Sequence, residues 1–321
     1  MLPALTLMAL ASLPLMLASP DTPGEQGGGS GRTASPPVIL VKSAGVRAVQ
    51  EVADAFSDGC RVHVQQMYVG DSPTEIAHSR EIVQSARGVL VAVGQPAVEL
   101  LVGVRAHVVY ALAPDPPLGN IGVNNTAMPY QVFRALLQVR PKAKRIAVVS
   151  SERGAHRLTL ARQAARSLGI ELIELPAPDS AAAIRALRAL FVPLAEESDG
   201  VAIPSPVDAL WLGADPQLID MQVLQFVLQM QIQWQVPVVA STRQQVHFGA
   251  LLAVDWPLEA VGRHLAWQVN QLLEDPERVE LVARDHPGGP PDVVLNAQAA
   301  RRLGINVEAL RHATGWKVIE R

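Results

Sequence analysis

Short runs of β-branched residues alternate with helical stretches along most of the chain, and this alternation limits the fold more than any other feature. In a parallel sheet helices cover both faces, so each strand reads as an unbroken apolar run and a helix links it to the next strand. Predicted strands lie over residues 38–41, 61–68, 88–93 and 107–111, and a second series lies over residues 145–149, 171–175, 200–203 and 236–240. Two consecutive series predict an α/β protein with two Rossmann-like lobes, each built on a parallel sheet.

The chain length agrees with two lobes, because 321 residues suit two domains of about 130 residues each. Further β-runs follow at residues 250–254 and 293–295, with a helix between them over residues 258–273. These late elements fit if the chain crosses back between the lobes, which predicts a hinge of three segments near residues 124–127, 253–256 and 291–296. The predicted lobes are therefore residues 37–125 with 255–291, and residues 126–254 with 292–321.

The N-terminal segment has the character of an export signal. Residues 2–18 are almost wholly apolar, and small residues at Ala18 and Ser19 suit cleavage, which predicts a signal peptide over residues 1–19. No Lys or Arg precedes Arg32, so an uncleaved anchor stays an alternative. Residues 20–36 are rich in Gly, Pro and Ser and predict a flexible linker. The expected location of the folded part is therefore the periplasm or the medium.

Composition and spacing exclude several classes of function. Net charge is only −3 and no basic block occurs, so nucleic acid is not an expected partner. The eight histidines show no HxxxH or HExxH spacing, and no phosphate-binding loop or nucleophile elbow is present. We expect no metal, no cofactor and no catalysis, and the single Cys60 cannot form an internal disulfide.

Polar residues follow many of the predicted strands, at the edge where ligands bind in open α/β sheets. Hydroxyl and amide groups there can donate to the carboxylate of a zwitterionic or anionic solute, although each can instead cap its own helix. The candidates are Ser43, Gln95, Ser150, Ser151, Ser205, Ser241 and Thr242. Arg243 could clamp a carboxylate or form an ion pair, and Asp115 and Asp208 could receive an ammonium group or serve as turn residues beside a proline.

Several short motifs recur in the order found in one family. They are Gly94-Gln95-Pro96-Ala97, Asp115-Pro116, residues 141–146 (PKAKRI), Ser241-Thr242-Arg243 followed by Gly249-Ala250-Leu251, residues 291–296 and residues 299–305. With these motifs the chain, over roughly residues 37–310, resembles the substrate-binding proteins of ABC importers, in particular the tryptophan/tyrosine-type (TrpX-like) family.

The resemblance implies the type I periplasmic binding protein fold, whose lobes close over a small-molecule solute without chemistry. It implies an amino acid or similar solute and an ABC permease of the inner membrane as partner. The turn residues Gly94, Gln95 and Pro96, with Ala113 and Asp115 beyond the fourth strand, complete the expected ligand-binding set.

Two loops depart from the family pattern, and they concern the ligand rather than the fold. Lys42-Ser43-Ala44-Gly45 follows the first strand, and Ser150-Ser151-Glu152-Arg153 follows the first strand of the second lobe. They favour an alternative in which a degenerate envelope protein uses the same fold for protein contacts and has a filled or uniformly apolar cleft. An α/β enzyme is a third reading and requires converging titratable groups.

Overall fold

The structure is a computed structural model that describes residues 38–70, 72–113, 121–196, 205–213, 215, 218, 220–277 and 286–320. The expected signal peptide over residues 1–19, the linker over residues 20–36, the strand over residues 200–203 and Asp115 lie outside the described residues. No helix in the described part of the chain has the length and apolarity that a membrane span requires.

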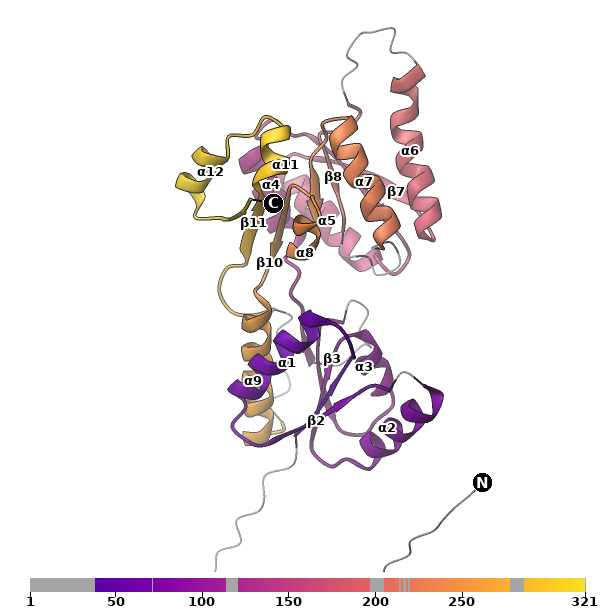
Figure 1. The fold of residues 1–321 in the computed structure, drawn as a ribbon, viewed down its shortest axis with the longest axis vertical. Helices are drawn as coiled ribbons and strands as arrows, with labels where there is room; N and C mark the ends of the chain where they lie inside the picture. Colours follow the sequence, from indigo (N-terminus) through magenta and orange to yellow (C-terminus); the bar gives the residue numbers. More distant parts are fainter. Residues whose placement is uncertain are drawn as a thin grey trace, which may run out of the picture. The chain divides into compact units, whose positions relative to one another are not determined.

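The first sheet has the strand order β2-β1-β3-β4-β5, and all of its pairs are parallel (Figure 1). Its strands are β1 (Val38–Lys42), β2 (Val64–Tyr68), β3 (Val89–Val93), β4 (His107–Ala111) and β5 (Ile121–Val123). In β1 all five residues are buried, as expected of a strand with a helical layer on each face. Val38 and Leu40 join one apolar cluster, whereas Ile39 and Val41 join another, because successive side chains point to opposite faces.

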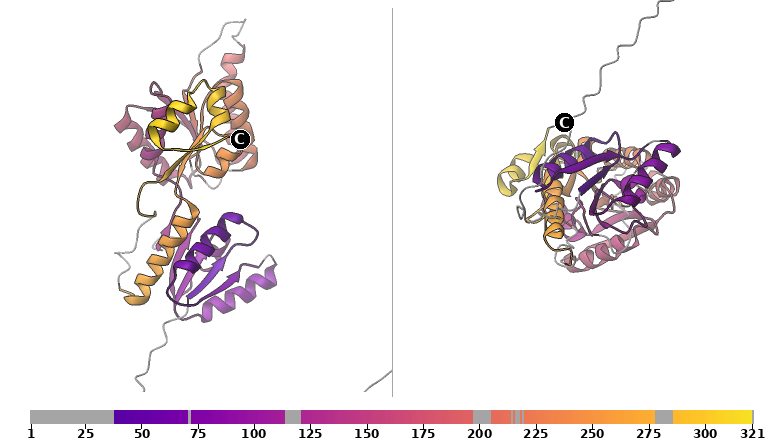
Figure 2. Two further views of the ribbon diagram at one scale, coloured as in Figure 1. Left: turned by 60° about the vertical axis from the view of Figure 1, so that its left-hand side comes forward. Right: turned by 90° about the horizontal axis from the view of Figure 1, so that it is seen from below.

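Helices from two distant parts of the chain cover the first sheet. The helices are α1 (Arg47–Gly59), α2 (Pro73–Ser85), α3 (Gln95–Leu100) and α9 (Leu258–Glu274). Helices α1 and α9 pack on each other on the Val38 face, and α2 and α3 cover the Ile39 face (Figures 1 and 2). A helix that follows the second sheet in sequence therefore completes the core of the first.

The contact between α1 and α9 depends on Gly262. A Cβ atom at this position would lie 2.5 Å from the carbonyl oxygen of Val52 and 2.9 Å from the amide nitrogen of Phe56. Only glycine allows the two helix backbones to approach this closely.

We expect Gly262→Ala to lower the free energy of unfolding by about 1–3 kcal/mol, as overpacking of a core does. In an open helix the same change would stabilise the protein, because alanine has the higher helix propensity. Urea denaturation measures the effect, and Gly288→Ala is the control because a Cβ there would meet no atom within 4 Å. Equal stability of Gly262→Ala and the unsubstituted protein would show that the helices are free to separate.

The second sheet has the order β12-β11-β10-β9-β8-β6-β7. Its strands are β6 (Arg145–Ser150), β7 (Glu171–Pro176), β8 (Ala209–Trp211), β9 (Val238–Ala240), β10 (Leu252–Asp255), β11 (Asp292–Asn296) and β12 (Lys317–Ile319). Strands β10 and β11 pair antiparallel, and the other pairs are parallel. The predicted α/β class with parallel sheets is confirmed, while β5, β8 and β12 were not predicted.

Helices again lie on both faces of the second sheet. They are α4 (Pro129–Val139), α5 (Ala155–Leu168), α6 (Ser180–Glu196), α7 (Met221–Gln233), α8 (Arg243–His247), α11 (Ala297–Arg302) and α12 (Val307–Thr314). Helices α4 and α5 bury residues in the same apolar cluster as α1 and α9, and α6 and α7 form a separate cluster on the other face.

Within the described residues the chain passes between the elements of the two sheets three times. The first passage links β5 to α4, the second links β10 to α9, and the third links α9 to β11. The residue limits proposed above for the lobes stay a prediction.

Candidate functional site

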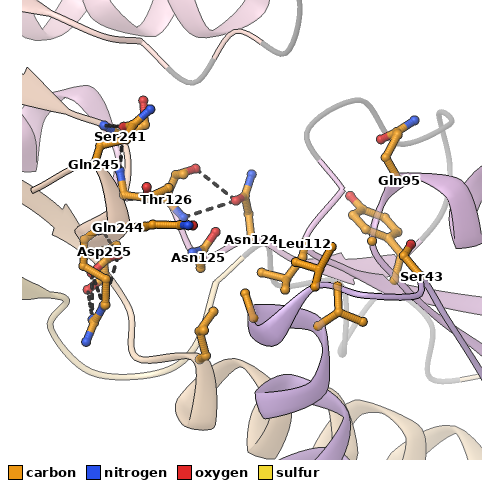
Figure 3. A pocket seen from close by; sticks show the side chains of 18 of the residues that line it. Ser43, Gln95, Leu112, Asn124, Asn125, Thr126, Ser241, Gln244, Gln245 and Asp255 are labelled. Atoms are coloured by element: carbon orange, nitrogen blue, oxygen red, sulfur yellow. Dashed lines mark hydrogen bonds and ion pairs between the residues drawn. The ribbon is translucent and has the colours of Figure 1, made fainter. Parts of the chain in front are cut away.

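A cavity of about 1220 Å³ lies at the carboxyl ends of strands from both sheets (Figure 3). This is the position at which parallel α/β sheets offer loops and helix N-termini to a ligand. Of the residues predicted from the sequence, it is lined by Ser43, Gly94, Gln95, Pro96, Ser241, Thr242 and Arg243.

The first sheet contributes a tight turn after β3. Gly94 has φ +95°, and a Cβ atom there would lie 2.5 Å from Ser43 Oγ. The Gly94 N–H donates to the Ala111 carbonyl at 2.9 Å, so the turn also follows the end of β4. The turn therefore holds Ser43 and Gln95 at neighbouring strand ends. It requires glycine at position 94, because any other residue would strain the backbone there.

The second sheet contributes Ser241, Thr242 and Arg243, but their backbone donors are already used. Gln245 Oε1 accepts from the N–H groups of Ser241 (2.9 Å) and Thr242 (3.3 Å), and Asp255 Oδ2 accepts from the Arg243 N–H at 2.9 Å. The Ser241 hydroxyl donates to the Leu212 carbonyl. These groups shape the wall of the cavity, and their amides are not available to a solute.

Two passages between the sheets run side by side along the floor of the cavity. The Trp256 N–H donates to the Asn125 carbonyl at 2.9 Å, and the Ala127 N–H donates to the Val254 carbonyl at 3.3 Å. Thr126 and Asp255 form an antiparallel bridge between these bonds. The first and second passages are therefore joined into a short two-stranded element, at the position predicted for the hinge.

Trp256 joins the third passage to this element. Its indole N–H donates to the Gly289 carbonyl at 3.3 Å, and its ring stacks on His286 with centroids 4.9 Å apart. Because only 2% of Trp256 is exposed, this side chain packs where all three passages meet.

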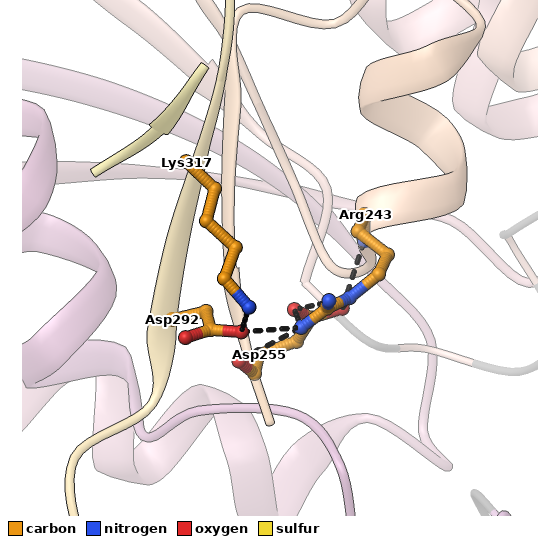
Figure 4. Close-up of polar contacts among 4 residues, drawn as sticks. All are labelled: Arg243, Asp255, Asp292 and Lys317. Carbon is orange, nitrogen blue, oxygen red and sulfur yellow. Dashed lines mark hydrogen bonds and ion pairs between the residues drawn. The ribbon is translucent and has the colours of Figure 1, made fainter. Parts of the chain in front are cut away.

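A cluster of four charged residues lies beside this two-stranded element (Figure 4). Arg243 Nη2 lies 2.7 Å from Asp255 Oδ1 and 3.2 Å from Asp292 Oδ2, and Lys317 Nζ lies 2.6 Å from the same Asp292 oxygen. Burial raises the pKa of Asp255, which is 1% exposed. The sequence left two roles open for Arg243, a clamp for a solute carboxylate or an ion pair within the protein. The observed contacts match the ion pair.

Arg157, near the start of α5, lines the cavity and was missed by the sequence-based reasoning. Its Nη2 donates to the Ala127 carbonyl at 2.6 Å, and its Nη1 donates to Thr126 Oγ1 at 3.4 Å. Burial lowers the pKa of Arg157 to about 10. The only signal in the sequence was an arginine one turn into a helix that follows a strand exit.

Ser205 and Asp208 do not reach the cavity. Asp208 Oδ2 accepts from the N–H groups of Lys144 (2.7 Å) and Arg145 (2.8 Å), and the Ser205 hydroxyl donates to the Val207 carbonyl at 2.7 Å. Both residues precede β8, whereas the prediction treated them as following a strand over residues 200–203. They therefore lie at the amino end of β8, opposite to the edge that was expected.

Ser150, Ser151 and Ala113 also do not line the cavity. The Ser151 N–H and hydroxyl donate to Asp215 at 2.7 and 3.0 Å in the interior, and Ser150 is buried beside them. Ala113 packs in the apolar cluster under α2 and α3. Arg153, in the loop after β6, and His156, at the start of α5, line the cavity instead.

Two amide side chains at the cavity make no hydrogen bond within the described residues. They are Asn125, on the first passage, and Gln244, in α8 (Figure 3). Among the described residues no group of three His, Cys, Asp or Glu side chains could hold a metal ion. To a ligand the arrangement offers hydrogen-bonding groups, the guanidinium of Arg157 and apolar surface.

The fold is shared with several solved structures. A substrate-binding protein with adhesive properties from Clostridium difficile, in its ligand-free, open form, has a TM-score of 0.65 at 13% identity over 89% of this chain and 99% of that one. The fold is that of the type I periplasmic binding proteins.

Two further structures cover the whole of their own chains. An ABC domain from Streptococcus pneumonia in complex with L-Trp has a TM-score of 0.62 at 16% identity over 88% of this chain and 100% of that one. A conserved domain protein from Vibrio cholerae has a TM-score of 0.61 at 20% identity over 89% of this chain and 100% of that one. No model of a known protein family matches the sequence, and no curated protein matches it.

Proposed function

We propose that this protein is the solute-binding component of an ABC importer, which closes its two lobes over a small molecule in the cavity. The observation that carries the proposal is a cavity of about 1220 Å³ whose lining comes from the carboxyl ends of strands in both sheets. A solute that contacts both sets of loops favours the closed arrangement, because it binds that arrangement with more contacts.

The paired passages support a closing motion. Backbone hydrogen bonds join residues 125–127 to residues 254–256, so a rotation there would be carried by a short two-stranded element. Hinges of binding proteins absorb large changes in a few residues between rigid lobes. The buried Trp256 would hold the three passages in register during such a motion.

The remaining parts of the proposal follow from this function. The partner that receives the solute is an ABC permease in the inner membrane, and the protein works in the periplasm or outside the cell after export. A tryptophan/tyrosine-type solute preference is consistent with the neighbour that binds L-Trp. The alternative of a degenerate protein with a filled cleft is disfavoured by the size of the cavity and by its free amide groups.

Denaturation of the purified full chain followed by mass spectrometry tests for a captured small molecule. A thermal-shift series with L-tryptophan, L-tyrosine, L-leucine, D-glucose and D-allose complements it. At a concentration of about 100 times its Kd, a solute adds roughly 2.7 kcal/mol to the stability of the folded state, which we expect as a rise in Tm of several degrees.

Gln244→Trp should weaken binding roughly tenfold or more, because a bulky ring would occupy the cavity. Gln225→Trp is its control, since Gln225 is exposed on α7 and does not line the cavity. The proposal fails if no captured molecule is found and no solute changes the Tm. It fails equally if Gln244→Trp binds the identified solute as tightly as the control does.

A further inference from the structure

We infer that Arg157 anchors a carboxylate of the solute, so that the solutes of this protein are small carboxylates with an apolar body rather than neutral sugars. This inference rests on the proposed function and names the substrate class of the same cavity.

The first step is the hydrogen-bonding state of Arg157. A guanidinium has five N–H donors, and two of them are used, by the Ala127 carbonyl and by Thr126 Oγ1. The Arg157 Nε atom is buried without a hydrogen-bond partner, and no carboxylate of the described residues lies within ion-pair distance of the side chain. The guanidinium also lies over the Trp211 ring, 5.9 Å from its centroid, but a ring does not neutralise the charge, and a largely buried cation is costly unless an anion joins it.

The second step is the charge of the other groups at the cavity. Its two acidic residues are engaged: Asp220 accepts from the Val223 N–H at 2.8 Å, and Asp255 is bonded to Arg243. The Arg243 charge is neutralised by that contact, whereas no carboxylate of the described residues forms an ion pair with Arg157. Arg157 therefore favours an anionic group of the ligand beside it.

The lowered pKa of Arg157 agrees with this state. Burial disfavours the charged form of the guanidinium. A ligand carboxylate would offset that cost, because it is negatively charged and accepts hydrogen bonds from the guanidinium. Arginine also presents a planar fork that matches a carboxylate with two parallel hydrogen bonds.

The third step is the apolar part of the wall. Leu112, Leu160, Met221, Leu224 and Phe248 line the cavity, and Phe248 is 50% exposed at its edge. A sugar would need a polar partner for each hydroxyl group, because an unpaired hydroxyl is costly to bury. This surface instead suits the aliphatic or aromatic body of a carboxylic or amino acid.

The position of Arg157 links the anchor to the hinge. The side chain that would hold the carboxylate also bonds to Thr126 and Ala127, on the first passage between the sheets. A bound carboxylate would therefore order this side chain and, through it, the hinge element.

The test measures binding of matched acids and amides to the full chain by calorimetry. The probes are L-tryptophan with L-tryptophanamide, L-leucine with L-leucinamide and 3-phenylpropionate with 3-phenylpropionamide, and D-glucose and D-allose are the neutral probes. The proteins are the unsubstituted chain, Arg157→Gln, Arg157→Lys and Arg162→Gln. Arg162 lies on the same helix, is paired with Glu174 and does not line the cavity, so it is the matched control.

We expect at least one acid to bind the unsubstituted protein, and its amide to bind roughly 30-fold or more weakly. Arg157→Gln should weaken binding of that acid to a similar extent and change binding of the amide little. Arg157→Lys should retain part of the affinity for the acid because it keeps the charge, and Arg162→Gln should bind like the unsubstituted protein.

The outcomes separate this inference from the proposed function. A sugar bound in place of the acids, or an acid bound equally by Arg157→Gln, would overturn the carboxylate anchor and leave the binding function standing. Failure of every probe together with the absence of a captured molecule would overturn both. If Arg157→Gln does not fold, the comparison of each acid with its amide on the unsubstituted protein still decides whether the solute needs a carboxylate.

Discussion

Replacement of Trp256 by alanine is expected to lower the free energy of unfolding by about 3–5 kcal/mol, the range of large-to-small changes of a buried aromatic residue. The side chain is 2% exposed, donates to the Gly289 carbonyl and stacks on His286. Its removal would leave a void where the three passages meet, and the proposed closing motion would lose its common pivot.

Chemical denaturation measures this loss, and solute affinity measured on the same variant reports the effect on the hinge. Trp256→Phe is the intermediate variant, because it keeps an aromatic ring but loses the indole hydrogen bond and part of the buried ring volume, and it should cost less than Trp256→Ala. Trp267→Ala is the control: Trp267 is 39% exposed and stacks on His264 on the surface of α9. A Trp256→Ala protein as stable as the Trp267→Ala protein would show that the passages do not depend on this side chain.

Arg243→Ala is the second change with a large expected effect, a loss of about 3–5 kcal/mol in the free energy of unfolding. Arg243 gives Asp255 a hydrogen bond from its backbone and contacts from its guanidinium at 2.7 and 3.0 Å. Without the guanidinium, a carboxylate that is 1% exposed would remain charged in the interior. Most of the effect is the cost of that unpaired charge.

The pH dependence of this loss follows from the state of Asp255. Burial raises its pKa, so the folded form of Arg243→Ala binds a proton more readily than the unfolded form does. Stability of the variant should therefore be highest at acid pH and fall as the pH rises through the pKa of the folded state. The difference from the unsubstituted protein should narrow as the pH falls from this raised pKa toward the ordinary aspartate pKa of about 3.9.

Two further variants check the assignment. Adding Asp255→Asn to Arg243→Ala removes the buried charge and should recover part of the lost stability. Lys317→Ala removes the exposed partner of Asp292 and should cost at most about 1 kcal/mol. A double variant less stable than Arg243→Ala at pH 7 would contradict the role given to the charge.

The strand exits of the candidate site could be predicted because they follow from local pattern. The apolar runs of β1, β3 and β9 are short and uninterrupted, and the residue types after them change abruptly to Ser, Gly and Thr. Parallel strands bring such exits to one edge, so Ser43, Gly94 and Ser241 line the same cavity although almost 200 residues separate the first from the last.

The misplaced residues show the limit of that reasoning. Asp208 was assigned to the wrong edge because β8 has only three residues and follows it, a run too short to stand out from its surroundings. Ser151 follows β6 as predicted, but it bonds to Asp215, more than 60 residues away in the chain. No local pattern reports a partner at that separation.

The order of apolar and polar residues along the chain thus determined the α/β class, the two consecutive strand series and the sheet edge at which a solute could be held. These features depend on the spacing of apolar side chains and on the direction of the strands. Tertiary packing alone decided how polar groups are used. It engaged Arg243 with Asp255 and left Arg157 facing the cavity without an acid. The physical reason is that a charge is neutralised by whichever group the fold brings within a few ångströms, and those distances are set only when distant segments pack together.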